Sequence, residues 1–252
     1  MSTVTGRIKE IKQPRGGYLP LRSFTVKDMD TLGEVTSPEN IHAGTVGMAV
    51  DYLTRLITGS TRAEAFNISL QGARLIGEET TARGLLNRLN GLTDDSIRAA
   101  CQLSGFDVVY RAGHSSYKPV NQINPDDETI KNIRIMTERM RLFFEANPPT
   151  LKEFEFTGAY THLIRIGDGD ILTKDTLWDI KVSKTKPQPK NTLQILVYWI
   201  MGRRSIHPQF QTIEKLGIVN PRLGKTWTIA VEEIPDSTLT QVSSDVIGYA
   251  SL

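Results

Sequence analysis

The chain has 252 residues, of which 39% are hydrophobic and 23% charged, a composition typical of a globular protein with a sizeable core. Its formal net charge is only +2, so the overall electrostatic field does not indicate a nucleic-acid-binding protein, and any basic surface must be local. The single cysteine, Cys101, excludes a disulfide framework and a multi-cysteine zinc or iron–sulfur site within this chain.

The first half of the chain, residues 1–149, has the patterns of a mainly helical region, although residues 1–36 show no clear period. Ser37 is the predicted N-cap of a helix that ends at Gly59, because apolar residues recur between them at helical spacing. The segment of residues 124–149 predicts another helix, with Asn124 as its N-cap and acidic residues in its first turn. Between these two, helices are predicted over residues 61–76, 78–91 and 92–105, and a loop over residues 106–123.

The character of the sequence changes at residue 150, where strand-like alternation begins. Strands are predicted over residues 151–167, 170–173, 175–183 and 226–234, helices over residues 192–202, 205–215 and 236–252, and a basic loop over residues 184–191. The helix of residues 192–202 is apolar nearly all round and is therefore expected to be buried. We expect an α/β protein in which residues 1–149 form a mainly helical region that packs on a core of residues 150–252.

Acidic residues lie in segments that otherwise read as buried strands. Residues two apart on a strand share a face, so Asp179 and Lys181 should lie together. The alternate residues should point into a core, and these are Trp178, Ile180 and Val182. If the strand that holds Asp170 is the neighbour, its carboxylate converges on that of Asp179. Two crowded carboxylates repel each other unless a cation lies between them, and hard oxygen ligands suit Mg²⁺ or Mn²⁺.

Lys181 would lie beside such a metal ion. There its ammonium group can orient or activate a water molecule, or stabilise the negative charge that builds on a phosphate in the transition state. A pair of metal-binding carboxylates with an adjacent amine is therefore suited to the hydrolysis of phosphodiester bonds.

These residues resemble the signature of the PD-(D/E)xK nuclease superfamily and, within it, of the RecB-like branch. Asp170 matches the acid at the start of one strand, and Asp179-Ile180-Lys181 matches the acid–x–Lys element of the next strand. The RecB-like branch adds a helix with Gln-x-x-x-Tyr, which the segment "QILVY" supplies as Gln194 and Tyr198. These two residues are four apart and share one helix face. The resemblance covers roughly residues 150–232.

The resemblance implies a restriction-endonuclease-like core with the element order αβββαβ, and a Mg²⁺-dependent nuclease that acts on DNA. It implies a set of metal ligands, which are Asp170, Asp179 and the main-chain carbonyl of Ile180. Lys181 would serve the attacking water. Gln194 would position groups beside the site, and Tyr198 would support the site or touch the substrate.

Two features of the sequence depart from the family pattern or leave an alternative open. Met48 stands roughly where many members carry a histidine on the first helix, and Asp51, three residues further on, is an alternative metal ligand from that helix. Asp168 competes with Asp170 for the role of the first acid. Asp170 is preferred because apolar strand residues follow it directly.

Basic residues flank the expected site. Lys184, Lys186 and Lys190 would contact substrate phosphates, which position DNA without reading its sequence, and a solvated loop is the alternative. Two other classes of function remain open. One is a DNA-binding or scaffold protein that uses the same fold without catalysis, and the other is a regulator that reads DNA through a helix–turn–helix in residues 78–105.

The expected partner is DNA, and an assembly of identical chains is left open. No apolar run approaches the roughly 20 residues needed to span a bilayer, and the N-terminal residues lack the apolar core of a signal peptide. We therefore expect a cytoplasmic protein that does not associate with a membrane.

Overall fold

The computed structural model describes residues 2–29, 32–36 and 38–250, and the chain forms two compact units. The sheet unit comprises Met1–Met29 and Ala146–Leu252, and the helical unit comprises Asp30–Glu145. Helices and strands both occur, and the strands form one mixed sheet, which confirms the α/β class expected from the sequence. The predicted division at residue 149 differs from these units in one respect, because residues 1–29 belong with the C-terminal part of the chain.

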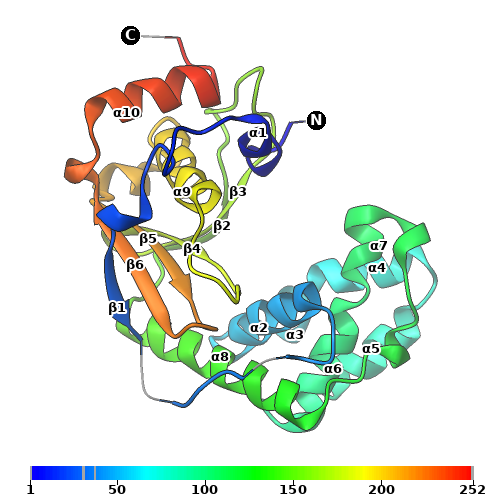
Figure 1. The fold of residues 1–252 in the computed structure, drawn as a ribbon. Helices are drawn as coiled ribbons and strands as arrows, with labels where there is room; N and C mark the ends of the chain where they lie inside the picture. The colour runs from blue at the N-terminus through cyan, green and yellow to red at the C-terminus, as the bar shows by residue number, and fades with distance from the viewer. Residues whose placement is uncertain (1, 30–31, 37, 251–252) are drawn as a thin grey trace. The chain divides into compact units, whose positions relative to one another are not determined.

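The sheet unit is built on six strands in the order β1-β6-β5-β4-β3-β2 (Figure 1). The strands are β1 Thr25–Asp28, β2 Leu151–Glu155, β3 Asp168–Leu172, β4 Thr176–Ile180, β5 Lys215–Asn220 and β6 Lys225–Ala230. β4 and β5 are parallel, and all other neighbouring strands are antiparallel. A parallel pair needs a long crossover connection, and the helix α9, Pro189–Gly202, lies in this crossover.

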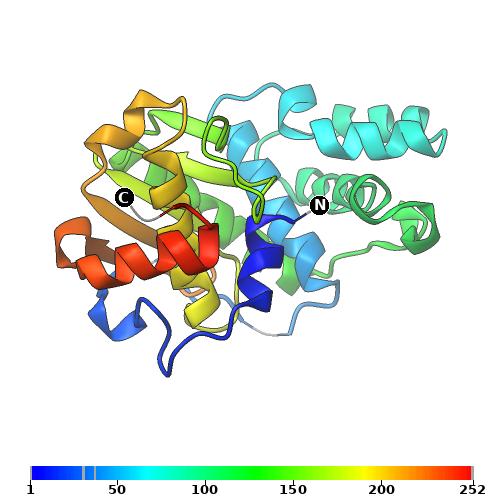
Figure 2. The same cartoon turned by 90° about the horizontal axis from the view of Figure 1, so that it is seen from above.

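The helix α9 covers one face of the sheet and contacts β4 and β5 (Figure 1). Every residue of α9 from Thr192 to Gly202 is buried, as expected for a helix that is apolar nearly all round. The helix α1, Val4–Glu10, and the last helical segment pack against α9 in turn (Figure 2). This last segment consists of α10, Asp236–Gln241, and a π-helical stretch, Val242–Ile247. α9 is therefore the middle layer of the sheet unit.

The helical unit consists of seven α-helices in the part of the chain that the structure describes. These are α2 Ala43–Ile57, α3 Arg62–Ala65, α4 Asn67–Leu75, α5 Glu79–Asn87, α6 Asp94–Ser104, α7 Asp107–Ala112 and α8 Asp127–Ala146. Short 3₁₀ turns occur in the chain at Leu21–Ser23, His114–Ser116, Val120–Gln122, Pro208–Thr212 and Val231–Glu233. Among the described residues, none of the helices combines the length and the apolar character needed to cross a bilayer.

The first helix of the helical unit begins later than the sequence predicts. The predicted N-cap, Ser37, lies outside the described residues. α2 begins at Ala43, and the Nδ1 atom of His42 accepts a hydrogen bond from the Gly44 N–H at 3.1 Å. A histidine ring thus satisfies one of the unpaired N–H groups at this helix end, which sequence rules assign to shorter polar side chains.

Other boundaries in the helical unit also differ from the prediction. The cap of α8 is Asp126, whose carboxylate accepts from the Thr129 N–H at 2.8 Å, and the side chain of Asn124 instead donates to the carbonyl of Asn121. The single helix predicted over residues 61–76 is divided into α3 and α4. The expected loop of residues 106–123 contains α7.

A buried polar cluster joins three helices of the helical unit. Asp107 of α7 is fully buried, and both of its carboxylate oxygens accept hydrogen bonds from hydroxyl groups. Ser69 of α4 donates to Oδ1 at 2.6 Å, and Tyr52 of α2 donates to Oδ2. Burial raises the pKa of Asp107, and the hydrogen bonds from Ser69 and Tyr52 act against burial. The cluster fixes the three helices at one point.

The sequence patterns miss two elements of the sheet unit, which are α1 and β5, and they leave residues 1–36, which contain β1, without an assigned structure. β5 follows a short 3₁₀ turn in the segment where a helix over residues 205–215 is predicted. A glycine, Gly217, lies in the middle of β5 and weakens its strand signal. It is required there, because a Cβ atom at this position would come within 2.3 Å of the Trp178 ring. The strand predicted over residues 151–167 ends at Glu155.

Candidate active site

The two predicted acids come from neighbouring strands. Leu172 of β3 pairs with Leu177 of β4, and continuing this antiparallel register by two residues places Asp170 opposite Asp179. Opposite residues in antiparallel strands lie about 4.5–5.5 Å apart and interact directly. The Asp170 carboxylate also reaches across to β4, where Oδ2 accepts a hydrogen bond from the Ile180 N–H at 2.7 Å.

Asp179 lies on the face of β4 that α9 covers. Leu177, two residues earlier and therefore on the same face, is fully buried in the main core of the sheet unit. Trp178, on the opposite face, lies outside this core and packs over Gly217. Trp178 is buried, as predicted, but on the face away from α9, and the acid shares the face of the main core. Ile180 and Val182 are half-buried.

Asp179 is 1% exposed, and Lys181 is its partner in an ion pair. Lys181 Nζ lies 2.9 Å from both carboxylate oxygens and donates its hydrogen bond to Oδ1. Asp179 Oδ2 is buried and accepts no hydrogen bond from the described residues. A carboxylate oxygen has lone pairs for more than one partner, so Oδ2, which faces the Lys181 ammonium group at 2.9 Å, is also suited to a cation or a solvent molecule.

The charges around Lys181 raise the pKa of its ammonium group. Burial alone would lower this pKa, but the negative charges of Asp179, Asp170 and Asp168 outweigh the effect of burial. The pKa of Asp179 is also raised, because burial disfavours its carboxylate and the ion pair with Lys181 offsets this only in part. Lys181 is therefore protonated at neutral pH, and an additional positive charge at this place would stabilise the ionised form of Asp179.

Gln194 and Tyr198 of α9 form a hydrogen-bonded pair one helical turn apart. Gln194 Nε2 donates to Tyr198 Oη at 2.8 Å, and both side chains are buried. Burial raises the pKa of Tyr198, and the charges of Asp179, Asp170 and Asp168 raise it further. The phenol is therefore protonated at neutral pH, and these electrostatic effects show that it lies within reach of the acids. The Tyr198 ring packs against Phe156, with ring centroids 5.0 Å apart.

Lys181 also lines a polar hollow between the end of β4 and the start of α9. The hollow has a volume of about 230 Å³. Its lining residues are Lys181, Ser183, Thr185, Pro187, Gln188, Lys190, Asn191 and Asn220. Of the three predicted substrate-binding lysines, Lys190 lines this hollow, and Lys184 and Lys186 are exposed outside it. Two ammonium groups and several neutral polar groups thus surround one small space, which suits an anion with several oxygen atoms.

Asn220 is a part of this hollow that the sequence patterns miss. It is 1% exposed at the end of β5, and its Nδ2 donates to the Ser183 carbonyl at 2.9 Å. Its Oδ1 accepts from the Arg222 and Leu223 N–H groups, so the side chain holds both the loop after β4 and the turn after β5. The usable signal is an asparagine directly before a proline at a strand end, which indicates a turn.

The atoms that can hold a metal ion at this site are carboxylate and carbonyl oxygens of Asp170, Asp179 and Ile180. No group of three or more His, Cys, Asp or Glu side chains in the described ranges is arranged to hold a metal. Mg²⁺ does not need such a group, because one or two carboxylates, several waters and substrate phosphates usually complete its coordination. The buried Asp179 Oδ2, which accepts no hydrogen bond from the described residues, fits an ion of this kind.

The alternative acids lie in different surroundings. Asp168 is exposed at the first position of β3, and its charge acts on both Lys181 and Tyr198, so it belongs to the same acidic cluster. Asp51 lies on α2 of the helical unit, where its two oxygens bind the Arg55 guanidinium at 3.1 and 2.5 Å. Asp51 is therefore engaged in a local ion pair within its own helix.

Comparisons of the chain with models of protein families, with curated proteins and with solved structures found no match. The assignment of a function therefore depends on the chemistry of the chain's own residues.

Proposed function

We propose that the protein is a metal-dependent nuclease that hydrolyses phosphodiester bonds in DNA. The proposal is supported by the grouping of the residues that resemble the PD-(D/E)xK signature, because Asp170, Asp179 and Lys181 lie together and the two acids act electrostatically on Tyr198. It is also supported by the element order β2, β3, β4, α9 and β5. This order agrees with the βββαβ part of a restriction-endonuclease-like core.

The observation that carries the proposal is that Lys181 lies between the buried carboxylate of Asp179 and a hollow that is open to a substrate. On one side its ammonium group pairs with the buried Asp179, and on the other side it lines the hollow that also contains Lys190. The Lys181 side chain is 26% exposed, so a substrate can reach it. A purely structural ion pair does not need to border a cationic hollow.

In this proposal, the metal ligands are Asp170, Asp179 and the Ile180 carbonyl. A bound Mg²⁺ or Mn²⁺ ion would stabilise charge on the phosphate and favour ionisation of water. Lys181 holds its proton, because its pKa is raised, so it acts as a hydrogen-bond donor to the attacking water or to a phosphate oxygen. Lys190 would bind a phosphate oxygen in the hollow.

The experiment incubates the purified chain with linear, circular and single-stranded DNA, in Mg²⁺ and in EDTA. We expect cleavage in Mg²⁺ that EDTA abolishes and that the substitutions Asp179→Ala and Lys181→Ala remove. The Asp175–Lys215 ion pair provides a matched control. It has the same two residue types, with Lys215 Nζ 2.8 Å from Asp175 Oδ2, and Asp175 directly precedes β4. Asp175→Ala should leave cleavage intact.

Each outcome bears on the proposal. Full Mg²⁺-dependent activity in Asp179→Ala or Lys181→Ala would contradict it. The absence of cleavage together with retained DNA affinity would favour a DNA-binding or scaffold protein that does not catalyse. The unfolding temperature of each variant distinguishes a lost active group from a lost fold.

A further inference from the structure

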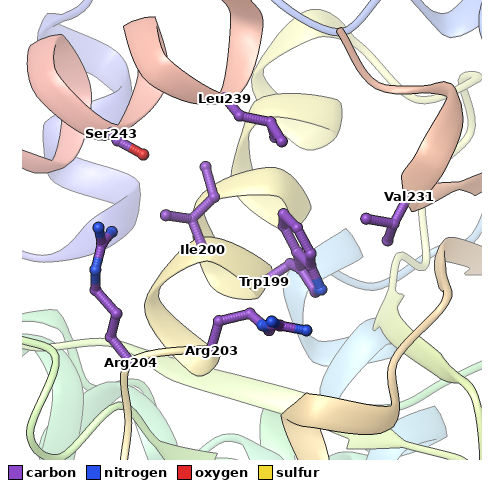
Figure 3. A pocket seen from close by; sticks show the side chains of 7 residues that line it. All are labelled: Trp199, Ile200, Arg203, Arg204, Val231, Leu239 and Ser243. Atoms are coloured by element: carbon purple, nitrogen blue, oxygen red, sulfur yellow. The ribbon is translucent and has the colours of Figure 1, made fainter. Parts of the chain in front are cut away.

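A second hollow lies at the C-terminal end of α9, with a volume of about 520 Å³ (Figure 3). Its lining residues are Trp199, Ile200, Arg203, Arg204, Val231, Leu239 and Ser243. None of these residues was assigned a role at the site of the acids. We call this hollow the arginine pocket.

Trp199 brings a buried hydrogen-bond donor to the arginine pocket. Its side chain is 9% exposed, and its indole Nε1 is buried without a hydrogen-bond partner among the described residues. Buried N–H groups are almost always paired, because an unpaired one loses its bond to water and gains nothing. Trp199 lines the arginine pocket, so a ligand bound there would lie beside this unpaired donor and would supply its acceptor.

Two guanidinium groups add positive charge to the pocket. Arg203 and Arg204 are exposed, and neither has an acidic partner within the described part of the chain. The Arg203 guanidinium lies 5.8 Å from the centre of the Trp199 ring, and that of Arg204 lies 4.0 Å from the centre of the Tyr249 ring. These contacts hold the guanidinium groups against aromatic rings, which do not use up their N–H hydrogen bonds, so the N–H groups are available to an anion. No acidic residue lines the pocket.

The polar groups lie at two ends of the pocket, with an apolar wall between them. Figure 3 shows Arg204 and Ser243 on one side of Ile200, and Trp199 and Arg203 on the other. Leu239 lies above Ile200 and Trp199, and Val231 adds an apolar side chain beyond Trp199. A complementary ligand has an anionic group, a second group of hydrogen-bond acceptors and a ring or other apolar body between them.

We infer that the arginine pocket binds an organic phosphate monoester with a ring that carries hydrogen-bond acceptors, as in a nucleoside 5′-monophosphate. A phosphate monoester carries about −1.5 to −2 charge at pH 7, so its phosphate suits Arg204 and Ser243 at one end of the pocket, and acceptors on its ring suit Arg203 and the indole N–H at the other end. The base of a nucleotide supplies acceptors for the indole N–H and an apolar face for the wall. This inference does not rest on nuclease activity, because the pocket shares no lining residue with the hollow beside Lys181.

The test is a titration of the ¹⁵N-labelled full chain with deoxyadenosine 5′-monophosphate, followed through the indole N–H resonances. The chain has three tryptophans, and Trp199→Phe identifies the resonance of Trp199. We expect the nucleotide to shift the Trp199 resonance and to leave those of Trp178 and Trp227 in place. Deoxyadenosine and inorganic phosphate, which each supply half of the ligand, should shift it only at much higher concentration.

Variants locate the bound nucleotide. Arg203→Ala and Arg204→Ala should each weaken binding about tenfold, which is typical of a lost charge-assisted hydrogen bond. Arg165→Ala, which removes an exposed arginine of the sheet unit outside the pocket, is the matched control and should bind as the unmodified chain does. Both pocket arginines are exposed, so their replacement does not endanger the fold.

Lys181→Ala separates this inference from the proposed nuclease. It should bind deoxyadenosine monophosphate with unchanged affinity, whether or not the protein cleaves DNA. No shift of the Trp199 resonance at millimolar nucleotide would overturn the inference. Binding that Lys181→Ala weakens and the arginine variants leave intact would also overturn it, because the nucleotide would then lie in the other hollow.

Discussion

Two buried aspartates, one in each unit, show different ways in which a protein accommodates an acid. Asp107 of the helical unit is fully buried, and each of its oxygens accepts a hydrogen bond from a hydroxyl group. Asp179 of the sheet unit is equally buried, but it has one ammonium partner and an oxygen that accepts no hydrogen bond from the described residues. Burial raises the pKa of both.

The difference teaches that burial and a raised pKa do not by themselves mark an active site. Asp107 has what it needs from its own helices, and its role is to hold them together. Both oxygens of Asp179 share one partner among the described residues, the Lys181 ammonium group, and Lys181 borders a cationic hollow. The distinguishing features of Asp179 are thus its small set of partners and the access to solvent through Lys181. Burial alone does not reveal either feature.

The largest expected effect is on catalysis, and it should occur at one aspartate only. Asp179→Asn removes a proposed metal ligand while keeping the size of the side chain, so cleavage of DNA should fall by about a thousandfold or more. Asp107→Asn should leave the cleavage rate per folded molecule unchanged. Initial rates on linear DNA in Mg²⁺ measure both. Equal losses in the two variants would remove the distinction between the aspartates.

The next largest effect is on stability, where a change at the Asp107 cluster should matter more than a change at Asp179. Tyr52→Phe leaves Asp107 Oδ2 without its hydroxyl donor, so the free energy of unfolding should fall by about 1–3 kcal/mol. Asp179→Asn removes a charge that the fold buries at a cost, and Lys181 can turn to solvent because it is 26% exposed. We expect it to destabilise the protein less than Tyr52→Phe does. Urea unfolding followed by circular dichroism compares them.

Cys101 gives a separate readout of the helical unit. Burial raises the pKa of its thiol to about 12, so the thiol should react with a thiol reagent at pH 8 only when α6 opens. Tyr52→Phe should accelerate labelling by about tenfold for each 1.4 kcal/mol of lost stability. Asp179→Asn, which changes the sheet unit, should label at the rate of the unmodified chain. Labelling accelerated equally by both variants would show that the two units open together.

The smallest expected effect is the pH dependence that Asp107 contributes. Its pKa in the folded chain is raised above the ordinary value of 3.8, so folding favours the protonated form. The resulting stabilisation is fully present below the unfolded-state pKa and is lost as the pH rises through the folded-state pKa. The stability advantage of the unmodified chain over Asp107→Asn should therefore be greatest in acid and smaller at neutral pH. Unfolding midpoints of both proteins across this pH range test the sign.

The sequence predicts those parts of the fold that depend on local pattern. The helix α9 is recognisable because its residues are apolar nearly all round, and β4 because strand-forming residues are concentrated there. β5 is not recognisable, because a short segment with a glycine becomes a strand only by pairing with β4 and β6, which are distant in sequence. The same holds for β1, whose partner β6 lies about two hundred residues away.

The candidate site shows the same limit. Alternation along β4 places Asp179 and Lys181 on one face, but it does not say which face α9 covers. All residues from Thr176 to Asp179 are buried, so both faces of β4 are covered, and the apolar Trp178 does not distinguish the face of α9 from the opposite face. Asn220 lines the hollow beside Lys181 from the end of β5. Because the sequence does not predict β5, it does not place Asn220 at the site.

The pairing of β1 with β6 has a practical consequence for dividing the protein into fragments. β1 shields one edge of the sheet, and the segment before it buries Val4, Ile8, Leu19 and Phe24 in the main core. A fragment that starts at residue 150 would present the unpaired backbone of β6 and an uncovered apolar surface, both of which promote aggregation. An expression design for the sheet unit should therefore retain residues 1–29 together with residues 146–252.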